Sequence, residues 1–113
     1  MSKRNATLPD VLQALADPTR LRVVELLSVE PHRAGELADA LGVTRPAVSK
    51  HLRVLLDAGL VSDERPADDA RARVFRLRPE SMAGVQAWLD QLQAHWNEQL
   101  GSFKRHVERK ATR

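Results

Sequence analysis

Hydroxyl and positively charged side chains are concentrated in one short stretch of the chain, residues 44–53. Its members of these two kinds are Thr44, Arg45, Ser49, Lys50 and Arg53. Between residues 42 and 58 three cations stand beside one anion, Asp57, so the local charge is +2. Arginine, lysine and hydroxyl groups donate hydrogen bonds to phosphate oxygens and to base edges in the major groove. The stretch therefore predicts a nucleic-acid-binding surface, and an ordinary solvated helix face is the structural alternative.

The residues around this stretch have the pattern of two helices joined by a tight turn. Leu37 and Leu41 lie four residues apart, which is the spacing of one helix face. Gly42 follows them and can take the left-handed conformation that ends a helix. Thr44 is a favourable N-cap for the next helix. The buried side of that helix is expected to hold Val48, Leu52, Leu55 and Leu56. The pattern predicts a helix-turn-helix over residues 33–58, with the start of its second helix directed at the major groove.

Two short helices are predicted ahead of this motif. The second opens at Asp17-Pro18, because aspartate is a good N-cap and proline lacks an amide that has no partner in a first helical turn. It is expected to end near Leu27. The apolar repeats that predict the two helices are Val11, Leu12 and Leu15 in the first and Leu21, Val24 and Leu27 in the second.

A β-hairpin is predicted after the motif, with strands from Leu60 to about Arg65 and from Arg71 to Leu77. In the segment 62–77 four acids balance four arginines: Asp63, Glu64, Asp68 and Asp69 against Arg65, Arg71, Arg73 and Arg76. Because phosphate repels carboxylates, we expect the tip of this hairpin to stay off nucleic acid. Arg71 and Arg73, on the returning strand, remain candidates for contacts to the backbone or the minor groove.

One long helix is predicted from residue 79 to 109. Its apolar residues recur at steps of three and four: Val85, Trp88, Leu89, Leu92, Trp96, Leu100, Phe103 and Val107. A soluble monomer of this size rarely leaves such a stripe exposed, so another surface is expected to cover it. A core within the same chain is one possibility. We favour pairing with the same helix, and with the first helix, of a second chain.

Residues 8–80 resemble the winged helix-turn-helix repressors of the ArsR type. The likeness is carried, in order, by Ala14–Arg22 (ALADPTRLR), Glu36-Leu37-Ala38, Leu41-Gly42-Val43, Val48–Leu52 (VSKHL), Leu55 and Ala58-Gly59-Leu60-Val61. The resemblance implies a mainly α fold with a small β-hairpin, and a homodimeric repressor of its own promoter region. It implies residues 45–58 as recognition helix, residues 62–77 as wing, and an inverted-repeat operator in double-stranded DNA. The later residues Ala87-Trp88-Leu89 and His95-Trp96 look like a metal-independent branch of the family.

Nine residues are expected to contact DNA: Thr44, Arg45, Ala47, Ser49, Lys50, His51, Arg53, Arg71 and Arg73. Thr44 has an alternative task as N-cap. His51 matches a position that the family uses for DNA contact, but a histidine beside a buried face can equally be packed or hydrogen-bonded. The dimer interface is expected to contain Leu12, Trp88, Leu92, Trp96, Leu100 and Phe103. Two recognition helices related by a two-fold axis would enter successive major grooves about 34 Å apart, which favours a palindromic operator.

Composition excludes several classes of protein. The chain has 113 residues, of which 42% are hydrophobic and 29% charged, so we expect one folded domain over residues 1–113. It has no cysteine, which rules out disulfides, thiolate zinc sites and iron–sulfur clusters. No stretch approaches twenty consecutive apolar residues, so neither a signal peptide nor a membrane span is expected. A cytoplasmic location without membrane contact is the resulting expectation. The net charge of +3 is compatible with nucleic acid.

No metal site, cofactor or catalytic site is expected. One metal site of the family uses a cysteine pair on the third helix, where this chain has residues 36–39, Glu-Leu-Ala-Asp. The other uses Asp-x-His and a distant His-x-x-Glu or His-x-x-His. Here Leu92 lies two residues after Asp90, and Arg109 lies three residues after His106.

An enzymatic reading is equally unsupported. Ser49 and His51 are two residues apart on a predicted helix and therefore point to different sides, with no acid placed to orient the histidine. Two alternatives to an operator-binding repressor remain. One is a protein–protein interaction module that docks through the apolar C-terminal helix. The other is a repressor released by a small apolar ligand near Trp88 and Trp96. The sequence identifies no inducer.

Overall fold

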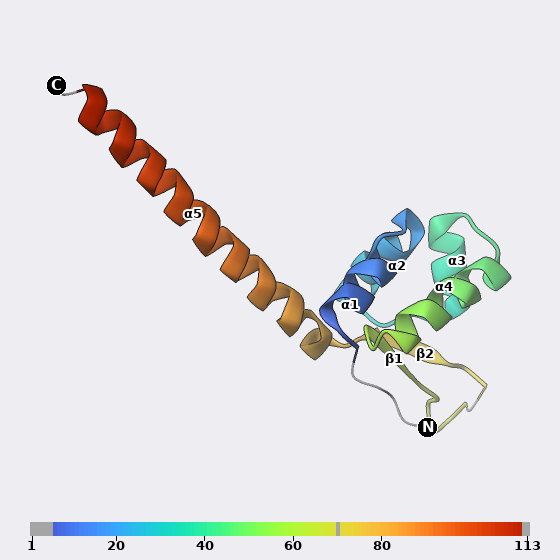
Figure 1. Ribbon diagram of the computed structural model, residues 1–113. Coiled ribbons are helices and arrows are strands. Elements are labelled where there is room, and N and C mark those ends of the chain that lie inside the picture. Colours follow the sequence, from blue (N-terminus) through green and yellow to red (C-terminus); the bar gives the residue numbers. More distant parts are fainter. Residues whose placement is uncertain (1–5, 70, 112–113) are drawn as a thin grey trace. The chain divides into compact units, whose positions relative to one another are not determined.

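The computed structural model describes residues 6–69 and 71–111 (Figure 1). The elements are α1 (Leu8–Leu15), α2 (Pro18–Val29), α3 (Ala34–Leu41), α4 (Arg45–Asp57), β1 (Val61–Glu64), β2 (Val74–Leu77), the 3-10 turn η1 (Pro79–Met82) and α5 (Ala83–Ala111). They form two compact units that divide between Met82 and Ala83. A mainly helical fold with one antiparallel hairpin is the class that the sequence predicts, and it is confirmed.

The helix starts follow from local capping chemistry. The Asp17 carboxylate accepts hydrogen bonds from the backbone N–H groups of Thr19 and Arg20, at 2.8 and 3.1 Å. These bonds satisfy two of the donors that have no partner in the first turn of α2. At the start of α4 the Thr44 hydroxyl accepts from the backbone N–H of Ala47 at 3.3 Å. Both caps lie where the sequence predicts them.

The turn between α3 and α4 depends on Gly42. This residue has φ +69° and ψ 31°, the left-handed conformation that glycine takes without a steric cost. The N–H of Val43 then closes the end of α3 by donating to the carbonyl of Ala38 at 3.1 Å. This turn sets the direction in which α4 leaves α3.

The core of the first unit is built from α1 to α4 and the hairpin. Its fully buried side chains are Val23, Leu37, Val48, Leu52, Leu55, Leu60 and Val61. Burying a leucine or valine of this kind contributes about 1.5–3 kcal/mol. Val48, Leu52 and Leu55 come from one side of α4, so packing against the core determines which side of α4 faces outward.

The apolar residues that predict α2 and α4 are not all buried. Leu21 belongs to the repeat that predicts α2, but 43% of its surface is exposed, because the side of α2 that packs in the core holds Val23 and Leu27, four residues apart. Leu56, expected on the buried side of α4, is only half-buried.

The strands are shorter than the sequence predicts. β1 and β2 pair in antiparallel register, with Val61 opposite Leu77 and Glu64 opposite Val74. The segment between them is closed by turn hydrogen bonds, Asp69 N–H to Pro66 O at 3.2 Å and Ala72 N–H to Asp69 O at 3.1 Å. These local bonds replace the ladder bonds that longer strands require.

A short bridge fastens the loop before α3 to the hairpin. The backbone of His32 exchanges two hydrogen bonds with that of Phe75, at 3.1 and 2.8 Å. Phe75 is buried. The bridge holds the start of α3 beside β2, an arrangement that no local sequence signal indicates.

α5 is the second unit. The helix expected from Pro79 starts as the 3-10 turn η1, in which Ser81 N–H donates to Arg78 O at 2.9 Å, and becomes an α-helix at Ala83. None of the described residues of α5, 83–111, is buried. Within the part of the chain that the structure describes, no helix is long and apolar enough to cross a membrane.

Candidate nucleic-acid interface

The exposed side of α4 carries most of the side chains expected to contact DNA. Arg45, Ser49 and Arg53 lie four residues apart and are all exposed, and the adjacent Lys50 is exposed as well. Residues four apart share one face of an α-helix. Because the opposite side of α4 is buried in the core, this row of polar groups is held outward rather than free to rotate.

Thr44 and Ala47 occupy the first turn of α4 in a different way. The Thr44 hydroxyl is engaged as the helix cap, so its oxygen is already an acceptor for the Ala47 N–H. Ala47 is half-buried. Both positions are therefore explained by the structure of the helix start, and a small side chain at residue 47 also lets another molecule approach the backbone.

His51 is tied to the junction of α1 and α2. Arg20 Nη1 donates to His51 Nδ1 at 3.3 Å. The same guanidinium donates from Nε to the carbonyl of Ala14 at 2.6 Å and from Nη2 to that of Gln13 at 3.5 Å. Arg20 thus connects the end of α1 to the middle of α4. Reasoning from local patterns gave Arg20 no such role, since its partner on α4 lies 31 positions away.

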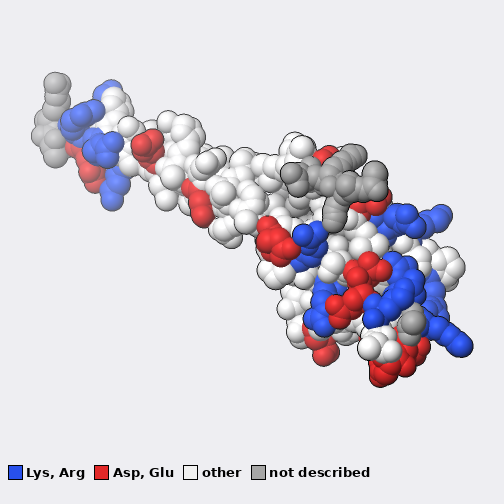
Figure 2. Space-filling view, turned by 90° about the horizontal axis from the view of Figure 1, so that it is seen from below, with Lys and Arg blue, Asp and Glu red and all other residues white. Residues whose placement is uncertain are grey.

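The hairpin neutralises much of its own charge. Arg73 pairs with Asp63, at 2.7 Å from Nη2 and 2.9 Å from Nε, and its guanidinium lies 4.9 Å from the centroid of the Phe75 ring. Arg76 pairs with Glu64 across the strands at 3.3 Å. Figure 2 accordingly shows basic and acidic groups interspersed on the compact part of the molecule, not one unbroken basic surface. Arg71 is exposed, and its backbone N–H donates to Asp69 Oδ1 at 3.1 Å.

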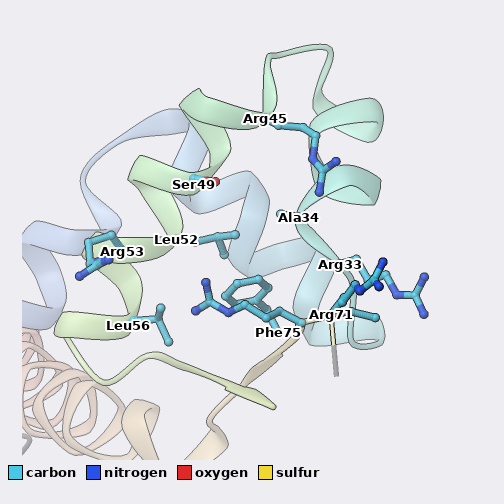
Figure 3. Close-up of a pocket in the computed structure, with 11 residues that line it drawn as sticks. Arg33, Ala34, Arg45, Ser49, Leu52, Arg53, Leu56, Arg71 and Phe75 are labelled. Carbon is cyan, nitrogen blue, oxygen red and sulfur yellow. The ribbon is translucent and has the colours of Figure 1, made fainter. Parts of the chain in front are cut away.

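A cleft of about 280 Å³ separates α4 from the returning strand and the start of α3 (Figure 3). Leu52, Leu56 and Phe75 supply apolar lining. The polar lining consists of Ser49 and five arginines: Arg33, Arg45, Arg53, Arg71 and Arg73. Every one of these polar residues except Arg33 is among the DNA contacts predicted from the sequence. Arg33 is not, because it precedes α3 and only the fold brings it to the cleft.

The residues expected at a dimer interface lie on two elements. Leu12 is half-buried in α1. Trp88, Leu92, Trp96 and Leu100 recur every four residues along α5 and are exposed, as is Phe103. The exposed fraction reaches 58% for Trp96 and 66% for Phe103. They form an apolar stripe that nothing in α5 itself covers.

Metal ligation has no visible support in the described ranges 6–69 and 71–111. These ranges contain no group of three or more histidine and carboxylate side chains placed to hold an ion. Asp90, which the sequence analysis considered, instead accepts a hydrogen bond from Gln86 at 2.9 Å.

Comparisons with known proteins agree with this architecture. A family model described as "Bacterial regulatory protein, arsR family" matches residues 17–63. The HTH-type transcriptional regulator Rv2034 of Mycobacterium tuberculosis is 44% identical over 96 residues, which cover 85% of this chain and 84% of that protein. The transcriptional repressor SdpR of Bacillus subtilis is 36% identical over 56 residues, and the match covers 50% of this chain and 62% of that protein.

A solved structure gives the same result in three dimensions. An ArsR-like transcriptional regulator from Rhodococcus sp. RHA1 superposes with a TM-score of 0.72 at 30% identity, covering 87% of this chain and 90% of that one. These relatives are transcriptional regulators and not enzymes. The fold therefore has its counterpart in a known regulator, and the chain belongs to the ArsR family of winged helix-turn-helix transcriptional regulators.

Proposed function

We propose that this protein is a homodimeric repressor that binds an inverted-repeat operator in double-stranded DNA through α4. The observation that carries the proposal is the division of α4 into two sides. Val48, Leu52 and Leu55 are buried, whereas Arg45, Ser49, Lys50 and Arg53 are exposed. A helix with one side held in the core and a basic, hydroxyl-bearing side turned outward is suited to the major groove.

The residues of α4 take different parts in this proposal. Arg45 and Lys50 reach base edges or phosphates, since both side chains extend beyond the helix surface and arginine can bind guanine with two hydrogen bonds. Ser49 and Arg53 add phosphate or base contacts. Thr44 caps the helix, and Ala47 allows close approach. His51 is assigned to positioning α4 through Arg20, on the strength of their hydrogen bond.

The hairpin contributes less to binding in this proposal. Arg71 is exposed and lines the cleft, so it is assigned a phosphate contact. Arg73 can contribute only by sharing its guanidinium between DNA and Asp63. The acidic tip, with Asp68 and Asp69, stays away from the DNA because phosphate repels it.

Dimerisation through the stripe on α5 and Leu12 completes the proposed function. Pairing of two chains would cover the exposed Trp88, Leu92, Trp96, Leu100 and Phe103, and it would place two copies of α4 for a palindromic site. The absence of cysteine, together with the failed histidine and carboxylate spacings, supports a repressor without a metal-sensing site.

The test is fluorescence anisotropy with the protein's own upstream DNA and an unrelated duplex, each at several salt concentrations. We expect tight, sequence-dependent binding that weakens steeply with salt. The double variant Arg45→Ala and Lys50→Ala removes two expected contacts and should lower affinity for the operator by at least about tenfold. The matched control, Arg22→Ala with Lys104→Ala, removes the same charges from α2 and α5.

Two results would contradict the proposal: equal affinity for both duplexes, or operator binding that the double variant leaves unchanged. Weak binding to every duplex, combined with a stable dimer, would favour a protein–protein module that docks through α5.

A further inference from the structure

Five arginines line one cleft in the first unit. The cleft between α4, the start of α3 and the returning strand is lined by Arg33, Arg45, Arg53, Arg71 and Arg73, and none of its lining residues is acidic. In Figure 3 Arg45 reaches down from the start of α4, while Arg53 lies on one side of Phe75 and Arg33 and Arg71 lie on the other. These arginines come from three separate parts of the chain.

Most of this charge is not neutralised within the described residues. Arg73 pairs with Asp63. For the other four guanidiniums, no carboxylate of residues 6–69 and 71–111 lies within ion-pair distance. Glu36 of α3 offsets part of the Arg33 charge at longer range, while its carboxylate accepts the backbone N–H of Arg33 at 2.9 Å and lies 3.4 Å from His32 Nδ1. The cleft therefore carries excess positive charge.

The physical setting strengthens attraction for an anion. Leu52 and Phe75 in the lining are buried, so the cleft has a low-dielectric wall on one side, where charges interact more strongly than in open water. Guanidinium groups match the geometry of phosphate and bind it with paired hydrogen bonds. A volume of about 280 Å³ accommodates a phosphate group with a small apolar substituent.

We propose that this cleft is a binding site for a phosphate group, with Arg33 and Arg71 as the ligating residues that lie outside α4. The phosphate comes either from the DNA backbone or from a small phosphate ester. If the phosphate belongs to the DNA backbone, the proposal adds a contact to the proposed function and rests on that function. A small ester would instead compete with DNA at the same surface and so regulate binding.

Arg33 is the residue that tests the site most directly. Its side chain makes no capping bond for α3, and its contact with Glu36 is made by the backbone N–H. Arg33→Ala should therefore leave the fold intact, which circular dichroism and the Tm can verify. Arg22→Ala is the matched control, because Arg22 is an exposed arginine of α2 outside the cleft lining.

The first experiment uses the full chain without DNA. Phenyl phosphate is titrated into the protein and followed by NMR at the methyl groups of Leu52 and Leu56 and the ring of Phe75. We expect saturable binding that is weakened about tenfold or more by Arg33→Ala and by Arg71→Ala, and not by Arg22→Ala. Phenol, which lacks the phosphate, should not bind at these positions.

The second experiment measures how the DNA affinity of each variant depends on salt. A backbone phosphate in the cleft predicts that Arg33→Ala lowers the slope of log K against log salt by about 0.9, with no such change for Arg22→Ala. A lowered slope in Arg33→Ala assigns the cleft to a DNA phosphate, whether or not phenyl phosphate also binds there. An unchanged slope, with ester binding that depends on Arg33, assigns it to a small phosphorylated ligand.

The proposal is overturned if phenyl phosphate fails to bind, or binds independently of Arg33 and Arg71, and the salt slope is also unchanged in Arg33→Ala. Failure of the proposed function gives a different result: the wild-type protein then binds both duplexes equally, or binds the operator as tightly after Arg45→Ala with Lys50→Ala. Neither result depends on Arg33, and the ester titration then decides whether the cleft binds phosphate.

Discussion

At the scale of single residues, three side chains join the start of α2 to the middle of α4. Asp17 caps α2, Arg20 in its first turn bonds to carbonyls at the end of α1, and Arg20 also reaches His51. The backbone N–H of Arg20, donating to the Asp17 carboxylate, holds the pKa of Asp17 below its ordinary value of 3.8. The hydrogen bonds by which Asp17 caps α2 thus lie next to the Arg20–His51 contact, which positions α4, the proposed DNA-binding helix.

The lowered pKa of Asp17 predicts a loss of stability in acid. A carboxyl with a depressed folded-state pKa stabilises the fold above its unfolded pKa of about 3.9, and this contribution is lost as the pH falls through the folded value. Asp17→Asn keeps a capping acceptor without the titration. Its Tm should therefore fall less than that of the wild type between about pH 5 and pH 2. Asp39→Asn, on the exposed side of α3, is the control; identical acid profiles for wild type and Asp17→Asn would refute the assignment.

At the scale of elements, the turn after α3 depends on backbone conformation alone. Gly42 has φ +69°, and a Cβ built there meets no heavy atom within 4 Å. The cost of any side chain at residue 42 is therefore the strain of the left-handed conformation. No repacking of neighbours can relieve it.

We predict that Gly42→Ala lowers the free energy of unfolding by about 1 kcal/mol. Gly101 provides the opposite case, because it lies inside α5 and a Cβ there meets only the mobile end of Arg105 at 3.5 Å. Gly101→Ala should leave stability unchanged or raise it by up to about 1 kcal/mol. Urea unfolding at one fixed protein concentration measures both, and a shift of the same sign in the two variants would contradict the conformational explanation.

The hairpin offers a test of how Arg73 is used. Asp63→Asn removes the carboxylate that pairs with Arg73, which frees the guanidinium for DNA. An exposed ion pair contributes up to about 1 kcal/mol, so operator affinity should rise by up to about fivefold. Asp68→Asn makes the same chemical change at the hairpin tip and should have a smaller effect. Anisotropy titrations compare them; equal effects would mean that these acids act only through net charge.

At the scale of the whole molecule, the exposed stripe on α5 predicts self-association. An aromatic anchor at the centre of an interface typically contributes 2 kcal/mol or more, so Trp96→Glu should raise the dimer Kd by at least about thirtyfold. Sedimentation velocity at micromolar concentration measures the mass. Ala94→Glu introduces the same acid on the side of α5 away from the stripe, since its neighbours three and four residues away are all outside the stripe, and it should leave the dimer intact. A wild-type monomer under these conditions would rule out the proposed homodimer.

Much of the fold could be predicted because its signals are local. The capping pairs at Asp17 and Thr44 and the left-handed Gly42 each act within a few residues, so their types alone indicate where helices start and stop. Periodicity was less reliable where several apolar residues competed for one face. In α2 the apolar repeat includes Leu21, whereas packing against the other helices buries Val23 and leaves Leu21 exposed.

The candidate site also contains residues that the sequence predicts and residues that it does not. Its basic residues on α4 were predictable from composition and helical spacing, since a helix places side chains regularly along its own length. Arg33, Arg20 and the backbone bridge between His32 and Phe75 were not, because each acts through a partner 31 or more positions away or through a cleft shared by separate elements. The helices, the turn and the family follow from signals that lie within short stretches of the sequence. Which charges share a cleft and which neutralise each other follows only from the folded chain, because those outcomes depend on distances between elements that no local pattern encodes.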